Sequence, residues 1–312
     1  MKLQSVARPG SWFCLAVFLM ISAGAAGQAQ PGYQLGRHIE PAYEGWRPNE
    51  DGTFSFMFGY MNENWAESPD IPVGENNFFE PGEPDRGQPT HFLPRRNRWH
   101  FEVVVPADWG DRELVWTLTH NGETRSAYAT LRQDYLVDNM VIASETGSLG
   151  AGTSSPESRA NVPPVVEVLG DAIRQARVGE AMELSTLVND DGLPVRRRDS
   201  TVSTEDALER MLRPPSRVTV GKVNGLFLSW NKYRGPEGGK VIFDPPLPKP
   251  WEDTRASANS PWGPLWLPPP IPEDGVYEVT ATFDMPGTWV IWARADDGGL
   301  YHDQYITVNV TE

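Results

Sequence analysis

Residues 276–310 read VYEVTATFDMPGTWVIWARADDGGLYHDQYITVNV, and this stretch decides the fold. Polar and apolar residues alternate in three runs separated by turn-forming residues at Pro286-Gly287 and Asp297-Gly298. The apolar positions are Tyr277, Val279, Ala281 and Phe283, then Trp289, Ile291, Ala293 and Ala295, then Ile306, Val308 and Val310. Such alternation is typical of antiparallel strands with one buried and one solvated face. The stretch therefore predicts sheets that pack face to face as a β-sandwich.

Motifs upstream of this stretch extend the pattern to about residues 163–312. A run ending in Asp190-Asp191-Gly192 is followed by a strand around Trp230, and then by Pro286-Gly287-Thr288-Trp289 and Asp296-Asp297-Gly298. This order resembles the PKD-like and related immunoglobulin-like modules of exported proteins. The resemblance implies the fold and says little about function, because the fold hosts many functions. Trp230 falls where immunoglobulin-like cores place a buried tryptophan, so we expect it at the centre of this core.

Two segments of this half look like insertions into the compact module. The first, 196–216, predicts one short helix with Ser203 as a plausible cap. The second, 245–272, is rich in proline, which favours an extended backbone, and it carries Trp251, Trp262 and Trp266.

The first half also predicts strands, and we expect residues 30–143 to form an all-β domain. Alternating apolar runs occupy 53–60, 98–105 and 114–118, and Asn121-Gly122 supplies a hairpin turn into a strand around 125–131. In the second run, Trp99, Phe101, Val103 and Val105 should share one face. The proline-rich stretch 67–96 is too long for a neutral connector, so it is a functional loop or a packed crossover. Residues 144–162 have the composition of a linker, so we expect them to connect two domains. The predicted fold class is an all-β protein with two immunoglobulin-like β-sandwich domains.

The N-terminus indicates export. Lys2 and Arg8 precede an apolar run and then small residues through Ala29, so residues 1–29 predict a signal peptide, and no transmembrane segment is expected in the mature chain. Removal of the signal peptide leaves a mature chain without cysteine, since Cys14 is the only one in the sequence. It also removes two positive charges, so the net charge changes from −15 to −17. Such acidity disfavours nucleic acid and suits a soluble protein of the periplasm or the extracellular space.

The usual catalytic motifs are absent from the sequence: no nucleophile elbow, zinc-protease helix, phosphate loop or dinucleotide fingerprint occurs. The strand pairs His38/Glu40 and His100/Glu102 have the spacing of metal ligands, but we interpret them as surface polar residues and predict no metal site from them. The two Asp-Asp-Gly motifs could offer carboxylates to calcium, although turn chemistry explains them more simply. We expect no cofactor, with calcium as the one possibility.

Two groups of residues are candidate binding positions. Asn62, Asn64 and Trp65 follow a strand, where amides beside an aromatic ring can bind a carbohydrate, although local Asn turns would explain the same residues. Trp251, Trp262 and Trp266 could stack on sugar rings or engage a protein, or they could pack onto the sandwich.

Export, a sandwich fold and no catalytic signature together predict a secreted or periplasmic, non-catalytic binding or structural module. Its partner would be a protein or glycan ligand in the cell envelope or outside the cell. The alternatives are a carbohydrate-binding protein and, with less support, a hydrolase that uses carboxylates spread over strands and loops.

Overall fold

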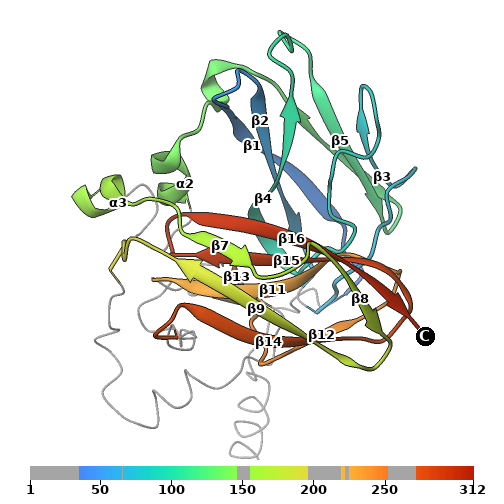
Figure 1. The fold of residues 1–312 in the computed structure, drawn as a ribbon. Helices are drawn as coiled ribbons and strands as arrows, with labels where there is room; N and C mark the ends of the chain where they lie inside the picture. Colours follow the sequence, from blue (N-terminus) through green and yellow to red (C-terminus); the bar gives the residue numbers. More distant parts are fainter. Residues whose placement is uncertain (1–34, 65, 146–154, 196–218, 222–224, 252–271) are drawn as a thin grey trace, which may run out of the picture.

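The structure is a computed structural model that describes residues 35–64, 66–145, 155–195, 219–221, 225–251 and 272–312. These residues form β-sheets almost throughout, with short helices between the two halves of the chain (Figure 1). The all-β, sandwich-type fold class predicted from the sequence is confirmed.

The N-terminal half contains two three-stranded antiparallel sheets. The first has the order β1-β2-β4 and comprises β1 (Ile39–Pro48), β2 (Phe54–Asn62) and β4 (Arg95–Val105). The second has the order β3-β5-β6 and comprises β3 (Asn77–Glu80), β5 (Leu114–His120) and β6 (Glu123–Ala129). Aromatic rings fill the space between them: Phe58 stacks on Phe101 at 5.4 Å, and Trp116 meets Phe101 edge-on at 5.0 Å. These offset and edge-on geometries are the favoured ones for aromatic pairs.

The predicted hairpin between β5 and β6 is confirmed. Asn121 and Gly122 adopt φ values of 51° and 77°, the left-handed conformation that a two-residue hairpin turn needs at both central positions.

The proline-rich stretch 67–96 is a packed crossover. It contributes the edge strand β3 and buries Ile71, Phe92 and Leu93 in the N-terminal core. The buried Asn77 side chain donates to the carbonyls of Ile71 and Pro89, so the irregular backbone has internal partners.

The expectation that Trp99 shares a face with Phe101 and Val103 is wrong. Phe58 pairs with Phe101 and Tyr60 with Asn97, so three residues of β4 lie opposite the single Gly59. Trp99 takes up this bulge with φ 49° and packs in a separate cluster, outside the N-terminal core that holds Phe101. A bulge re-aims side chains, and alternation read from sequence does not reveal it.

The C-terminal half is a sandwich of two four-stranded sheets. One has the order β11-β15-β16-β8 and comprises β11 (Phe227–Arg234), β15 (Gly287–Asp296), β16 (Tyr301–Thr311) and β8 (Ile173–Arg177). The other has the order β12-β14-β9-β7 and comprises β12 (Val241–Asp244), β14 (Val276–Phe283), β9 (Ala181–Asn189) and β7 (Val165–Val168). A parallel pair, β10 (Thr219–Gly221) and β13 (Lys249–Trp251), lies outside these sheets.

The core of this sandwich is the one predicted. Every apolar position named above in residues 276–310 belongs to a single buried cluster, and Trp230 lies in it with 2% of its surface exposed. The Trp230 ring stacks on Phe243 at 5.9 Å, and Phe283 contacts Trp289 at 5.2 Å.

Short helices connect the two halves. A 3₁₀ turn, η1 (Gln133–Tyr135), is followed by α2 (Asn139–Glu145) and α3 (Pro156–Ala160). Ser155 caps α3 in a capping box with Ser158, which satisfies donors at the helix start. The helix expected in 196–216 lies outside the described residues.

The two halves share a continuous core. Tyr233 and Trp292 belong to the C-terminal sheet, yet they pack into the aromatic cluster of the N-terminal half with 4% and 0% of their surfaces exposed. The Tyr233 carbonyl accepts hydrogen bonds from the backbone of Thr90 and His91. In Figure 1 the sheet that contains β15 and β16 accordingly lies between the N-terminal sheets and the sheet that contains β9 and β14.

Candidate functional site

A cleft of about 530 Å³ opens where the two halves meet. Its walls come from β1, β4 and the loop at Gly87 on one side, and from β11, β15 and β16 on the other. The lining residues are Arg47, Gly87, Trp99, Phe101, Glu102, Tyr233, Arg234, Val290, Tyr301, His302, Asp303 and Tyr305. Five of them are aromatic, and the charged ones carry both signs.

One wall is the outer face of β16. Tyr301, Asp303 and Tyr305 alternate with Ile306, Val308 and Val310, which face the sandwich core. Because successive side chains of a strand point to opposite faces, the two tyrosines and the aspartate line the cleft together, about 6.6 Å apart along the strand.

Tyr305 is a partly exposed residue whose ring is held by two neighbouring aromatic residues. The residue keeps 36% of its surface exposed, while Tyr233 contacts the ring edge-on at 4.7 Å and Trp292 lies parallel to it at 6.4 Å. A ring fixed in this way loses little freedom when a ligand covers it.

Asp303 is held beside these rings by a buried arginine. Arg294 donates from Nε to Asp303 Oδ1 at 2.7 Å and from Nη2 to Oδ2 at 2.6 Å, and Trp292 Nε1 donates to Oδ1 at 2.8 Å. Burial alone would lower the pKa of Arg294, but the Asp303 carboxylate raises it, so the guanidinium is charged at every working pH. Arg294 also donates to the Trp99 carbonyl at 2.5 Å and thereby ties the two halves together.

A second ion pair lines the opposite wall. Arg47 Nη2 donates to Glu102 Oε1 at 2.7 Å, and both side chains stay partly exposed, at 41% and 29%. An exposed pair of this kind contributes little to stability, but it presents donors and acceptors side by side.

Trp99, which also lines the cleft, has two unusual features. Its φ of 49° lies in a region that a bulky residue rarely adopts. Its buried indole N–H has no hydrogen-bond partner among the described residues. Strain and an unsatisfied polar group concentrate at functional sites.

Comparisons with known proteins give distant structural likenesses. No family model matches the chain, and no curated protein matches it. Domains 4 and 5 of the S-layer protein SbsC align over 88% of this chain and 98% of theirs, with 10% identity and a TM-score of 0.24. The adhesin InvE of Yersinia pseudotuberculosis aligns over 89% of this chain and 61% of its own, with 11% identity and a TM-score of 0.22. Immunoglobulin domains 1–4 of Sidekick-1 align over 88% of this chain and 48% of theirs, with 10% identity and a TM-score of 0.22. The fold assignment therefore rests on the strands and sheets of this chain itself.

The predicted binding residues do not line this cleft. Asn62 and Asn64 are fully buried, and their amides bond within the protein: Asn62 donates to the Glu67 and Phe92 carbonyls, and Asn64 exchanges hydrogen bonds with the Arg37 backbone. Trp65, Trp262 and Trp266 lie outside the described residues. Trp251 ends β13, and its side chain is also outside the described part of the structure.

Both Asp-Asp-Gly motifs form turns. Asp190 and Asp191 accept from the backbone N–H groups of Gly192 and Leu193, and Asp297 accepts from Gly299 and Leu300. Within the ranges described here, no group of three or more His, Cys, Asp or Glu side chains is arranged to hold a metal ion.

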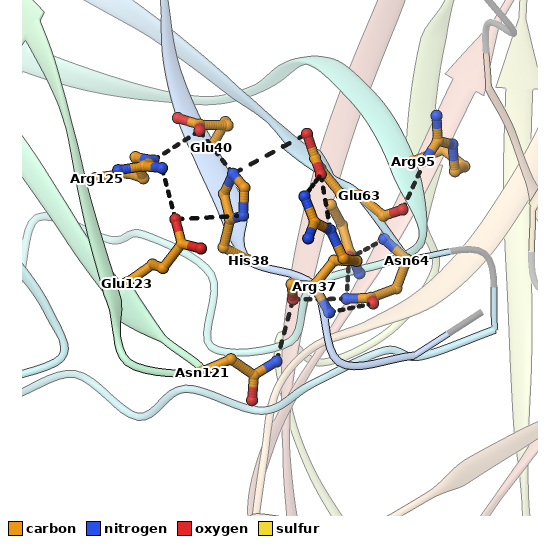
Figure 2. A network of polar contacts seen from close by, with 10 residues as sticks. Arg37, His38, Glu40, Glu63, Asn64, Arg95, Asn121, Glu123 and Arg125 are labelled. Atoms are coloured by element: carbon orange, nitrogen blue, oxygen red, sulfur yellow. Dashed lines mark hydrogen bonds and ion pairs between the residues drawn. The ribbon is translucent and has the colours of Figure 1, made fainter. Parts of the chain in front are cut away.

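A polar network surrounds His38 in the N-terminal half (Figure 2). His38 lies with Nε2 2.8 Å from Glu40 Oε1 and Nδ1 3.6 Å from Glu123 Oε2, and Arg125 bonds to both glutamates. His38 directly precedes β1, Glu40 lies on β1, and Glu123 and Arg125 lie on β6, so the network joins the two sheets. Arg125 pairs with the carboxylates of Glu40 and Glu123, so a structural role explains why these two glutamates lie beside His38.

The interpretation of the two His/Glu pairs as surface residues is wrong for the histidines, whereas Glu40 and Glu102 keep 41% and 29% of their side chains exposed. His38 is 7% exposed, and His100 is 1% exposed because it packs edge-on against Trp292 at 4.6 Å in the junction between the halves. A strand face that the other half of the chain covers can carry polar residues, and its sequence then looks like that of a solvated face. The sequence around His38 and His100 therefore gave no sign of their burial.

No helix in the described part of the chain is long and apolar enough to cross a membrane.

Proposed function

We propose that this chain is a non-catalytic binding module whose ligand occupies the cleft between its two sandwich domains. The observation that carries the proposal is the cleft itself, at about 530 Å³, with aromatic rings and ion pairs converging from both halves. Binding sites in proteins are concave, have aromatic walls and a few placed polar groups, and often lie between domains.

The packing at the junction supports this function. Strands supply most of the cleft wall, Phe101 and Tyr233 of that wall belong to one buried core, and Arg294 bonds across the junction to the Trp99 carbonyl. Packed walls of this kind hold the binding side chains in place before the ligand arrives. Binding then costs less free energy than it would if these side chains had to be ordered.

Location and domain organisation are part of the same proposal. Residues 1–29 would be removed on export, residues 30–143 and 163–312 would be the two domains, and 144–162 the connection between them. The acidic, cysteine-free mature chain suits the periplasm or the extracellular space. The similarity to PKD-like modules belongs to this proposal as well.

A hydrolase is the second candidate, since Glu102 and Asp303 both line the cleft. Each carboxylate is engaged by an arginine, Arg47 or Arg294, which orients it as a hydrogen-bond acceptor. The geometry therefore favours binding over turnover.

The test is an array of glycans and peptides probed with the protein and with Tyr305→Ala. We expect at least one class of ligand to bind the protein and to bind the variant far more weakly. Ligands that bind both proteins equally would place the site outside the cleft. Release of products from chromogenic glycosides or esters, abolished by Glu102→Gln, would overturn the non-catalytic proposal.

A further inference from the structure

The chemistry of the cleft identifies a class of ligand. We propose that the cleft binds a neutral saccharide, with one sugar ring stacked on Tyr305 and its hydroxyls bonded to the Glu102–Arg47 pair and to Asp303. This inference rests on the proposed function and adds the ligand to it.

The charges around the cleft balance in three ion pairs. Arg47 pairs with Glu102, and Arg294 pairs with Asp303. Arg234 pairs with Asp85, to which it donates two bonds at 2.7 and 3.0 Å. A balanced cleft on a chain of net charge −15 repels polyanions and offers no excess charge to a cation, so it favours a neutral ligand.

The polar groups match vicinal hydroxyls. Each sugar hydroxyl is both donor and acceptor, and two neighbouring hydroxyls are satisfied by one acceptor and one donor placed side by side. Glu102 and Arg47 supply this combination, because their 2.7 Å bond uses one carboxylate oxygen and one of the five guanidinium donors. Asp303 Oδ2 accepts a bond from Arg294 Nη2 at 2.6 Å, and its second lone pair can accept another bond.

The ring of Tyr305 supplies an apolar contact surface for the ligand. Sugar rings present C–H groups on their faces, and a flat ring buries these while leaving the hydroxyls at the rim. Tyr305 is the exposed ring of the set, and Tyr233 and Trp292 fix its orientation. Its position two residues from Asp303 places the platform and the acceptor about one sugar ring apart.

The experiment is isothermal titration with four neutral probes: cellohexaose, xylohexaose, laminarihexaose and chitohexaose. At least one should bind the wild-type protein saturably, and the affinity should change little between low and high salt, because no net charge is neutralised. Tyr305→Ala should weaken that binding tenfold or more, whereas Tyr305→Phe should retain most of it, since the ring and not the hydroxyl makes the contact.

Tyr128→Ala is the matched control. Tyr128 is 58% exposed on β6 and does not line the cleft, so its removal should leave the affinity unchanged. Thermal unfolding of each variant checks that the fold persists. If Tyr305→Ala is unfolded, Glu102→Gln is the second variant, with the same expected loss.

The failures are distinguishable. If no saccharide binds but a decaproline peptide does so in a Tyr305-dependent way, the saccharide inference is overturned and the binding cleft stands. If neither class of probe binds in a Tyr305-dependent way, both proposals fail. Binding that falls steeply with salt would contradict the neutral ligand.

Discussion

Replacing Asp70 by alanine should destabilise the protein strongly, because this carboxylate neutralises a buried lysine of the other half. Asp70 lies in the N-terminal crossover, and Lys232 lies on β11 with 4% of its side chain exposed. Lys232 Nζ is 2.9 Å from Asp70 Oδ1 and also donates to the carbonyls of Pro236 and Gly239 at 3.0 and 2.8 Å. His91 Nδ1 contacts the same carboxylate at 2.8 Å.

The expected magnitude follows from the charge left behind. Removing one partner of a buried ion pair leaves an uncompensated charge and costs about 3–5 kcal/mol. Two carbonyls still accept from Lys232, so the value should fall at the lower end of this range. Asp70→Ala combined with Lys232→Met should recover much of the loss, because the buried charge is then absent.

The dependence on pH has a defined sign. Burial alone would raise the pKa of Asp70, but the contacts with His91 and Lys232 outweigh it and hold the pKa below the ordinary value of 3.8. The contribution of this carboxylate to stability is therefore present above pH 3.8 and is lost as the pH falls through the lowered folded value.

The assay is denaturant unfolding of wild type, Asp70→Ala, the double variant and Asp134→Ala. Asp134 forms an exposed pair with Arg132, with 75% of its side chain accessible, so its removal should change stability by less than about 0.5 kcal/mol. If Asp70→Ala behaves like this control, the buried junction contact is refuted.

Two further predictions concern the C-terminal sandwich. Trp230→Ala should cost about 3–5 kcal/mol in denaturant unfolding, as expected for truncating a tryptophan that is 2% exposed, and a nearly neutral result would remove it from the core. Burial, with Asp296 beside it, raises the pKa of Asp297 to about 7, so ionising it opposes folding and stability should decline as the pH rises from 3.8 to about 7. Asp297→Asn should flatten this decline in unfolding measurements across that range, and an unchanged pH profile would contradict the assignment.

The sequence predicted the C-terminal sandwich well because its information is local. Alternation over residues 276–310 depends only on which face of each strand meets the core. The Asn121-Gly122 hairpin was predictable for the same reason. The burial of Trp230 was implied by the resemblance to immunoglobulin-like modules.

The junction could not be predicted, since it is made by contacts between residues more than a hundred positions apart. Trp292 and Tyr233 occupy a sheet face that is normally solvated, and only the packing of the other half explains why they are buried. Trp99 left its expected face because of a bulge, which has no reliable signature in one sequence.

The candidate site was missed for a related reason. The predicted binding residues lie in the segments 60–65 and 245–272, whereas all but one of the residues that line the cleft lie on strands. One signal was present: Tyr301 and Tyr305 alternate with Asp303 on the face of β16 opposite the core residues. Aromatic residues on an outward strand face indicate that something covers that face.

The most direct test of the central claim is a crystal structure of the protein soaked with the tightest-binding saccharide. We expect a sugar ring over Tyr305 with its hydroxyls within hydrogen-bond distance of Glu102 and Arg47. A saccharide bound at the tryptophans of 251–266, with the cleft between the two halves empty, would contradict it.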